Sequence, residues 1–355
     1  MSALTTFVNC PNLQGQLEDI FCTGRAEDTP ILSFLFSSFN NNGVLESRAV
    51  PSYGKKRVVE LLYSPRVLES EVETTVDHDC TANSKRGETS QLYDFDEGTG
   101  VHIDKYFDIL DLIERCESND MYMARLIQEM IDGCKRRMET QAAVDLWANA
   151  GAFSTKDYDQ DGTGITSSTK IVSTKYSAAL GGYINNRAHS AIMQTARMNA
   201  YCTAPIIIGD YEIVDFYNDA KIGCCAQTGI DWSGVNAQAP IIIPSYRISD
   251  TAGSVNNFLT LSAGAAIPIW FNLYGGAKAN MINDDSNYAG IIVDPATGIP
   301  FDLRITKGQV GTCTQVHIVI ELAWDLFYAP SGLFAVGDHL RGVNFVNKHI
   351  VTNPA

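Results

Sequence analysis

The chain has 355 residues, with 26 Lys and Arg against 41 Asp and Glu, and a formal net charge of −15. Hydrophobic residues make up 45% of it and charged residues 19%, which excludes an intrinsically disordered chain and leaves room for about two domains. The acidic balance disfavours a nucleic-acid-binding role, because binding to phosphates needs clustered Lys and Arg.

The first hundred residues predict an arm followed by a protruding hairpin. Residues 1–50 have little periodicity, and their apolar cluster Pro30–Phe36 is followed by the turn signal Asn40–Gly43. Further on, Leu68, Val72 and Val76 share one face of a predicted strand, which we expect to pair with Arg57–Tyr63. Two strands with polar faces and no neighbouring apolar segment predict an extended hairpin that stands off the body.

Helices are predicted next. Tyr106, Leu110 and Ile113 fit a 3.6-residue spacing, which predicts a helix that ends near Arg115. Three N-cap residues follow at 118–120, and an apolar stripe then runs from Met123 to Trp147, so a helix of roughly thirty residues is expected over 119–150. A helix of that length suggests a backbone around which the other elements are arranged.

Short helices alternate with apolar strands in the remaining chain. A helix is predicted over Asn186–Tyr201. Buried strands are predicted at Ile206–Ile208, Ile241–Ile243, Phe258–Leu261, Ile267–Leu273 and Ile291–Val293. Strict alternation from Val316 to Tyr328 predicts one long strand, well above the usual length of about 5–6 residues.

Catalytic motifs are missing from the sequence. It contains no phosphate-binding loop, no dinucleotide fingerprint, no H-E-x-x-H and no G-x-S-x-G. His78 and Cys80 could meet on one face of a strand as a nucleophilic pair, but we interpret them as polar loop residues. The vicinal Cys224 and Cys225 have no further Cys or His nearby to complete a metal site. The sequence therefore predicts a protein that is not an enzyme.

An acidic turn follows the predicted long helix. Asp157, Asp159 and Asp161 precede Gly162 in the D-x-D-x-D-G pattern that opens a calcium-binding loop. The twelfth position is Ser168, where such a loop needs a bidentate Glu. We interpret the segment as a turn, with a weak Ca²⁺ or Mg²⁺ site at the three aspartates as the alternative. No other cofactor is expected.

The cysteines and the apolar segments predict a protein that is made and kept in a reducing cytosol. The nine cysteines form no C-x-x-C pair, and the opening MSALTTFVNC lacks the basic and apolar regions of a secretory signal. The most apolar stretch, Ala265–Leu273, is far shorter than the ~20 residues of a membrane span. No membrane association is therefore expected.

The order of these parts resembles the major capsid proteins of tailed bacteriophages, whose fold is shared with encapsulins and herpesvirus shells. Asp111–Glu114 looks like the short acidic helix before the family's spine helix. Asp161–Ile165 is similar to the family's Gly-Asp-Gly-Thr-Gly loop, although Gln160 replaces the first Gly. Asp294–Leu303, followed by the long strand, looks like the re-entry into the peripheral domain.

The resemblance implies an α+β phage major-capsid fold, divided as follows. Residues 1–50 would be the N-terminal arm, 51–100 the extended loop that laps over a neighbouring subunit, 101–185 with 301–355 the peripheral domain with its spine helix, and 186–300 the axial domain. Some family members crosslink a Lys of the extended loop to an Asn on a neighbour. Lys55 and Lys56 lie near the start of the loop, but no motif identifies either as such a lysine.

The function implied by the resemblance is structural. The chain would assemble in the host cytoplasm into hexamers and pentamers of an icosahedral capsid that encloses double-stranded DNA in the virion. Scaffold, portal and decoration proteins would be its partners, without sequence-specific nucleic-acid contacts. Much of the negative charge is expected to face the particle interior. The alternatives are an encapsulin-like protein compartment, another virion protein such as a tail component, and a cytosolic α/β enzyme with an unrecognised active site.

Overall fold

The computed structural model describes part of the chain. The described elements form an α+β structure in which strands outnumber helices. The described residues are 29–37, 46–49, 57–63, 89–95, 99–108, 119–150, 170–173, 176–177, 182–183, 196, 204–210, 240–252, 257–274, 287–310, 313–328 and 346–352.

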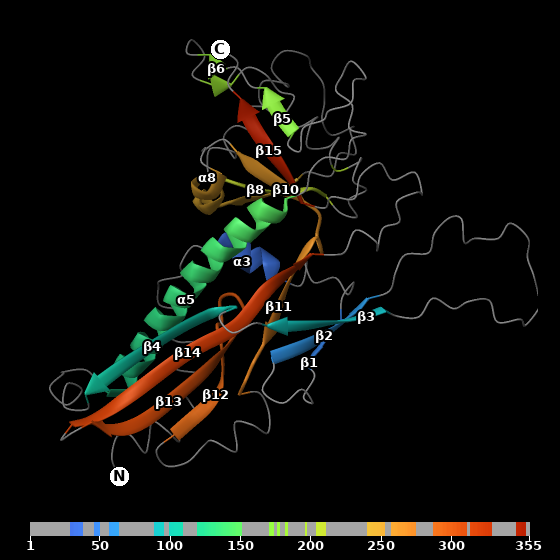
Figure 1. Cartoon of the computed structure of the whole chain (residues 1–355). Coiled ribbons are helices and arrows are strands. Elements are labelled where there is room, and N and C mark those ends of the chain that lie inside the picture. Colours follow the sequence, from blue (N-terminus) through green and yellow to red (C-terminus); the bar gives the residue numbers. More distant parts are fainter. Residues whose placement is uncertain are drawn as a thin grey trace, which may run out of the picture.

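One long helix, α5 (Asn119–Asn149), lies along one five-stranded sheet and reaches a second one at its C-terminal end (Figure 1). Its 31 residues span about 46 Å. The side chains of its apolar stripe are buried, among them Ile127, Ile131, Met138 and Leu146. The predicted helix over 119–150 is confirmed, because a stripe repeated every three to four residues over eight turns specifies a helix strongly.

The first sheet, here called the long sheet, is built on β14 (Cys313–Tyr328). Its order is β11 (Ala266–Phe271), β14, β13 (Pro300–Val310) and β12 (Asn287–Val293), and β4 (Val101–Asp108) also pairs with β14. All of these pairs are antiparallel. The predicted strand from Val316 to Tyr328 is confirmed, and it begins three residues earlier, at Cys313.

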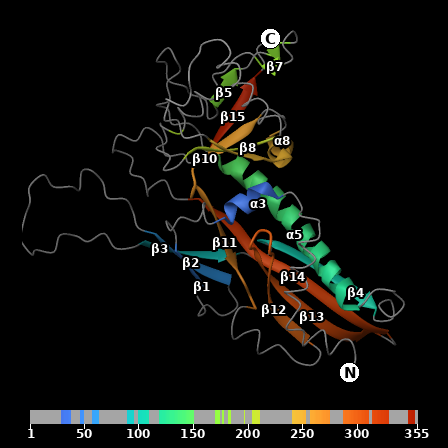
Figure 2. The ribbon, with the colours of Figure 1, turned by 180° about the vertical axis from the view of Figure 1, so that it is seen from behind.

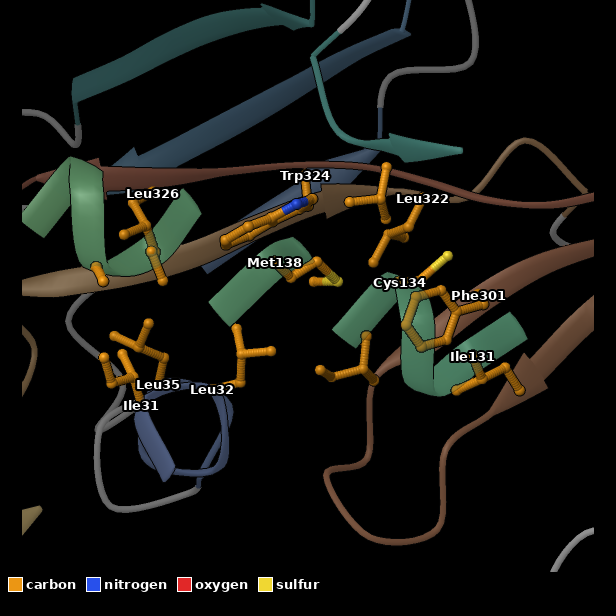
Figure 3. Packing of buried hydrophobic residues seen from close by; sticks show 14 of the residues in the cluster. Ile31, Leu32, Leu35, Ile131, Cys134, Met138, Phe301, Leu322, Trp324 and Leu326 are labelled. Atoms are coloured by element: carbon orange, nitrogen blue, oxygen red, sulfur yellow. The ribbon is translucent and has the colours of Figure 1, made fainter. Parts of the chain in front are cut away.

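The strict alternation along β14 gives the long sheet two distinct faces. Leu322, Trp324 and Leu326 are buried and lie beside Cys134 and Met138 of α5 (Figure 3). The side chains in between, such as Ala323 and Phe327, point to the opposite face. The long strand β14 therefore separates α5 from the residues that cover the opposite face of the sheet.

The second sheet, here called the short sheet, has the order β5 (Lys170–Ser173), β15 (Val346–Thr352), β10 (Phe258–Leu261), β8 (Ile206–Gly209) and β9 (Ile241–Pro244). β15 with β5 and β8 with β9 are parallel pairs, and the others are antiparallel. Helix α8 (Tyr246–Ala252) contacts α5, β8 and β10. β6 (Tyr176–Ser177) and β7 (Gly182–Tyr183) form a separate two-stranded ladder.

A third, smaller sheet corrects the predicted hairpin. β2 (Arg57–Tyr63) pairs along its whole length with β3 (Thr89–Phe95) and also with β1 (Glu46–Ala49). The predicted partner, 68–76, was therefore wrong for this strand. In β3, Tyr93 and Phe95 alternate with polar residues and lie on the face that is covered. Residues 68–76 lie outside the described part of the chain.

The start of the helix predicted from Tyr106 to Arg115 is also corrected, since Tyr106 lies in β4, while residues 109–115 lie outside the described part of the chain. Its cross-strand partner is His317. Val101 is buried while His102 and Asp104 are exposed, so the period at this point is two rather than 3.6. The predicted stripe had only three apolar residues, which are too few to distinguish a helical period of 3.6 residues from a strand period of two.

Each sheet draws its strands from distant parts of the chain. β11 and β12 belong to the long sheet together with β13 and β14, whereas β5 and β15 belong to the short sheet. The domain boundaries at 185/186 and 300/301 stay a prediction. Strand positions can be read from local periodicity, whereas strand partners depend on contacts between distant segments.

Candidate assembly site

Most of the sequence-predicted site residues lie outside the described part of the chain. These are Asp157, Asp159 and Asp161, together with His78, Cys80, Cys224, Cys225, Lys55 and Lys56. Among the described residues no three His, Cys, Asp or Glu side chains are grouped as metal ligands would be. The candidate site therefore has to be sought in the surfaces and anchors of the described elements.

A buried ion cluster fastens α5 to the long sheet, and we call it the lysine cluster. Lys135 Nζ lies 3.2 Å from Asp132 Oδ1 and 3.4 Å from Asp294 Oδ2. The Lys135 side chain is 1% exposed and that of Asp294 is fully buried. Burial raises the pKa of Asp132 despite the attraction of Lys135. Because charges at this depth are costly unless they are paired, the three residues fix α5 and the Asp294 turn against each other.

Asp294 lies in the tight turn that joins β12 to β13, within the segment that resembles the family's re-entry. Its Oδ2 accepts hydrogen bonds from the backbone N–H and the hydroxyl of Thr297. The Gly298 N–H donates to the Asp294 carbonyl at 2.7 Å, and Gly298 has φ of +73°, a conformation that favours glycine. One aspartate thus closes the turn and docks it on Lys135.

A second buried carboxylate, Asp302, ties β13 to the end of β11. Asp302 accepts hydrogen bonds from the backbone N–H groups of Leu273, at 2.6 Å, and Tyr274, at 3.1 Å. Burial nevertheless raises its pKa to about 6, because desolvation outweighs these bonds. The long sheet therefore contains a group that binds a proton more tightly when the chain is folded.

We expect Asp302 to make folding stability fall as pH rises. The unfolded carboxyl loses its proton near pH 4 and the folded one near pH 6, so between these values only the folded state binds the proton. The free energy of unfolding should drop by about 3 kcal/mol across that window on account of this group. Urea unfolding at pH 4.5 and 7 covers most of the window and should show about 2 kcal/mol of this drop. Asp302→Asn should flatten the difference between the two pH values, because the amide cannot ionise; an unchanged difference would contradict this assignment.

The third sheet docks on the face of β14 that points away from α5. Val59 and Phe95 pack with Ile269, Ala323 and Phe327 in one apolar cluster. The Tyr93 hydroxyl donates a hydrogen bond to Asp325 Oδ2 on β14. Figures 1 and 2 both show β14 between α5 and the β1–β3 sheet. The ends of the predicted extended loop are thus anchored, and residues 64–88 connect β2 to β3 from this anchored base.

The rest of that face lies between β4 and β12, and we call it the outer face; its β4 side chains are exposed, those of His317 and Glu321 are partly exposed, and Val319 is buried. His102, Asp104 and Tyr106 of β4 lie opposite Glu321, Val319 and His317 of β14. His102 Nδ1 lies 3.6 Å from Glu321 Oε2, and His317 Nε2 lies 3.5 Å from Asp104 Oδ2.

Exposed aromatic and aliphatic side chains accompany these charges. The Tyr106 ring stacks on His317 at 4.0 Å and is 61% exposed, while Ile291 and Val293 of β12 are also exposed. Exposed aromatic side chains surrounded by polar ones are typical of protein–protein contact surfaces. The outer face is thus suited to contact another protein.

Sequence reasoning missed the buried charged residues of α5, although a signal was present. Lys135 and Glu139 occupy positions of the apolar stripe, one turn after Ile131 and one turn before Ala142 and Ala143. A charge on a buried stripe indicates a buried partner. The prediction that the cysteines are buried structural thiols agrees with Cys134, whose pKa burial raises to about 12. Among the described helices, none has a stretch that is long and apolar enough to cross a membrane.

Comparison with known proteins gave matches only among solved structures. No family model and no curated protein matches the chain. The chain is similar to the cyanophage A-1(L) capsid asymmetric unit (9% identity, TM-score 0.49, covering 92% of this chain and 96% of that one). It is also similar to the capsid of Ralstonia phage GP4 (9%, 0.44, 90% and 89%) and to a chain of Mycobacterium phage Che8 (10%, 0.36, 86% and 92%). At these identities and TM-scores the similarity assigns no function by itself.

Proposed function

We propose that this chain is a structural, non-enzymatic capsid protein that assembles into the shell of a tailed-phage-like virion. The observation that carries the proposal is the arrangement of the parts. A single spine helix joins two five-stranded sheets, and a β-hairpin is anchored on the far side of one of them. This arrangement supports the reading of the chain as a spine helix with peripheral and axial domains and an extended loop, the parts that the sequence resemblance implied.

Within this proposal the two sheets define the domains. We assign the long sheet with α5 to the peripheral domain, and the short sheet with α8 to the axial domain. The peripheral domain then comprises strands from 101–108 and 266–328, and the axial domain strands from 170–173, 206–261 and 346–352. Each domain is discontinuous in sequence, so the chain passes repeatedly between them and the spine helix couples them mechanically.

The assembled state is part of the same proposal. Subunits would form the hexamers and pentamers of an icosahedral shell around double-stranded DNA, with scaffold, portal and decoration proteins as partners. The net charge of −15 would keep the inner surface from adhering to the packaged DNA. The outer face, which includes Tyr106 of β4, would contact a neighbouring subunit.

Removing the loop between β2 and β3 should separate folding from assembly. We expect a variant with residues 64–88 replaced by a short Gly-Ser linker to fold, because β2 and β3 stay anchored on β14 through Val59, Phe95 and Tyr93. The same variant should fail to form shells, because the loop would supply contacts between subunits. Circular dichroism reports the fold and sedimentation velocity reports the assembly.

A variant that keeps residues 64–88 in scrambled order is the matched control for length and charge. It should also fold and should also fail to assemble if the loop is recognised by its sequence. Wild-type shells from the linker variant would refute the role of the loop. Loss of folding would place residues 64–88 in the core of the subunit.

A further inference from the structure

A short N-terminal helix lies where α5 meets both sheets. Helix α3 (Pro30–Leu35) contacts α5, β11 of the long sheet and β9 of the short sheet. Figures 1 and 2 both show it against the side of α5. Among the described elements, α3 therefore contacts the spine helix and both sheets. It does so from far away in sequence, since Ile31 lies more than a hundred residues before Glu139 of α5.

The apolar side of α3 is buried between these elements. Ile31, Leu32 and Leu35 are fully buried, while Ser33 is exposed. Figure 3 shows the three apolar side chains pointing from α3 toward the region of Met138 and Leu326. Past the end of the helix, the Phe36 ring lies 5.3 Å from the ring of Trp270 on β11. The contact is thus as well packed as a core contact, although it is made by a segment predicted to be an arm.

A buried carboxylate on α5 receives the beginning of α3. The Ile31 N–H donates to Glu139 Oε1 at 3.0 Å, and the Leu32 N–H donates to Glu139 Oε2 at 2.9 Å. Glu139 is 1% exposed. The first N–H groups of a helix have no partner within it, and the Thr29 side chain makes no capping bond, so Glu139 replaces the usual cap. The negative charge is also favourable at the positive end of the helix.

We infer that residues 29–37 form a detachable wedge, whose docking on Glu139 holds the long and short sheets in one fixed relation along α5. A six-residue helix has no stability of its own in water, so the wedge docks and leaves as one unit. When it leaves, Glu139 loses the Ile31 and Leu32 donors, and the apolar gap against β9 and β11 opens. The wedge is thus an intramolecular lock on the shape of the subunit, and its value for assembly rests on the proposed function.

The test uses the full chain and variants of Glu139. Glu139→Ala should raise the amide exchange rates of Ile31 and Leu32 by roughly tenfold or more, because both charge-assisted bonds are lost. It should also split thermal unfolding into two transitions, with strands β8–β10 and strands β13–β14 losing protection at different temperatures. Glu129→Ala, an exposed glutamate on the same helix, and Ser33→Ala, on the exposed side of α3, should leave exchange and melting unchanged.

A purely local stabilising role for α3 would give a single transition at lower temperature in Glu139→Ala, and this outcome overturns the proposal. If that variant does not fold, the same measurements on the milder Glu139→Gln variant and on the wild-type chain test the proposal. In the wild type the amides of α3 should exchange through an opening that leaves β14 protected. Exchange of both segments only by global unfolding would refute a detachable wedge. Neither readout depends on shell formation, so a failed proposed function and a failed wedge give different results.

Discussion

Lys135→Met is expected to lower the free energy of unfolding by about 3–5 kcal/mol, the usual cost of removing one partner from a buried ion pair. Methionine keeps the apolar length of the side chain, but Asp132 and Asp294 are left facing each other without a cation. Asp294 is fully buried, so its charge cannot be hydrated without opening the turn between β12 and β13. The spine should therefore loosen from the long sheet at this point.

Two further variants make this expectation specific. Arg137→Met, an exposed cation two residues along the same helix, should change stability by less than about 0.5 kcal/mol. Lys135→Met combined with Asp132→Asn should recover part of the loss, because one of the two stranded carboxylates becomes neutral. Urea unfolding followed by circular dichroism measures all three variants. A loss below about 1 kcal/mol in Lys135→Met would show that the lysine cluster does not fasten the spine.

The second large effect is expected at Gly100, where β4 begins beside β14. Gly100 has φ of +124°, and a Cβ at this position would overlap the Leu322 carbonyl oxygen and lie 2.9 Å from Cα of Ala323. Both obstacles are backbone atoms of the central strand, so they cannot move without breaking its ladder. Gly100→Ala should therefore cost at least about 3 kcal/mol from backbone strain and overpacking together.

The contacts around Gly100 link this strain to the spine. Its carbonyl accepts a hydrogen bond from Gln141 Nε2 of α5 at 3.4 Å, and Gln141 Oε1 accepts one from Trp324 Nε1 at 3.2 Å. Displacing Gly100 disturbs this bridge between β4, α5 and β14.

Gly133→Ala is the matched control for Gly100→Ala. Gly133 lies inside α5 with only Ile103 Cδ1 near its Cβ position, at 4.0 Å. Alanine there should raise stability by roughly 0.5–1 kcal/mol. Thermal melting of both variants gives the comparison. Equal stability of Gly100→Ala and the wild type would contradict the close approach of β4 to β14.

Local periodicity predicted the elements of this chain better than their partners. The thirteen alternating residues from Val316 and the stripe of α5 specify a strand and a helix by themselves, because each repeats its period many times. The strands at 206–209 and 258–261 could be predicted because short apolar runs bounded by proline or polar residues are typical of buried strands. In each of these cases the signal lies within one segment.

The pairing of β2 with β3 and the membership of β15 in the short sheet could not be predicted in the same way. Both depend on which distant segment supplies the complementary edge, and many apolar strands offer one. The partners of the lysine cluster and of Glu139 could not be predicted for the same reason. Their positions on the apolar stripe indicated buried charges, but nothing near them in sequence identified Asp294 or the α3 backbone as partners.

The central claim is that this chain builds a closed shell. Electron microscopy of the purified full-length protein, across a range of concentrations and salt, tests it most directly. Icosahedral particles or rings of five and six subunits are expected, with the spine helix and the two sheets recognisable in each subunit. A monodisperse monomer under every condition, with a melting temperature raised by a small-molecule ligand, would contradict the claim and favour an enzyme.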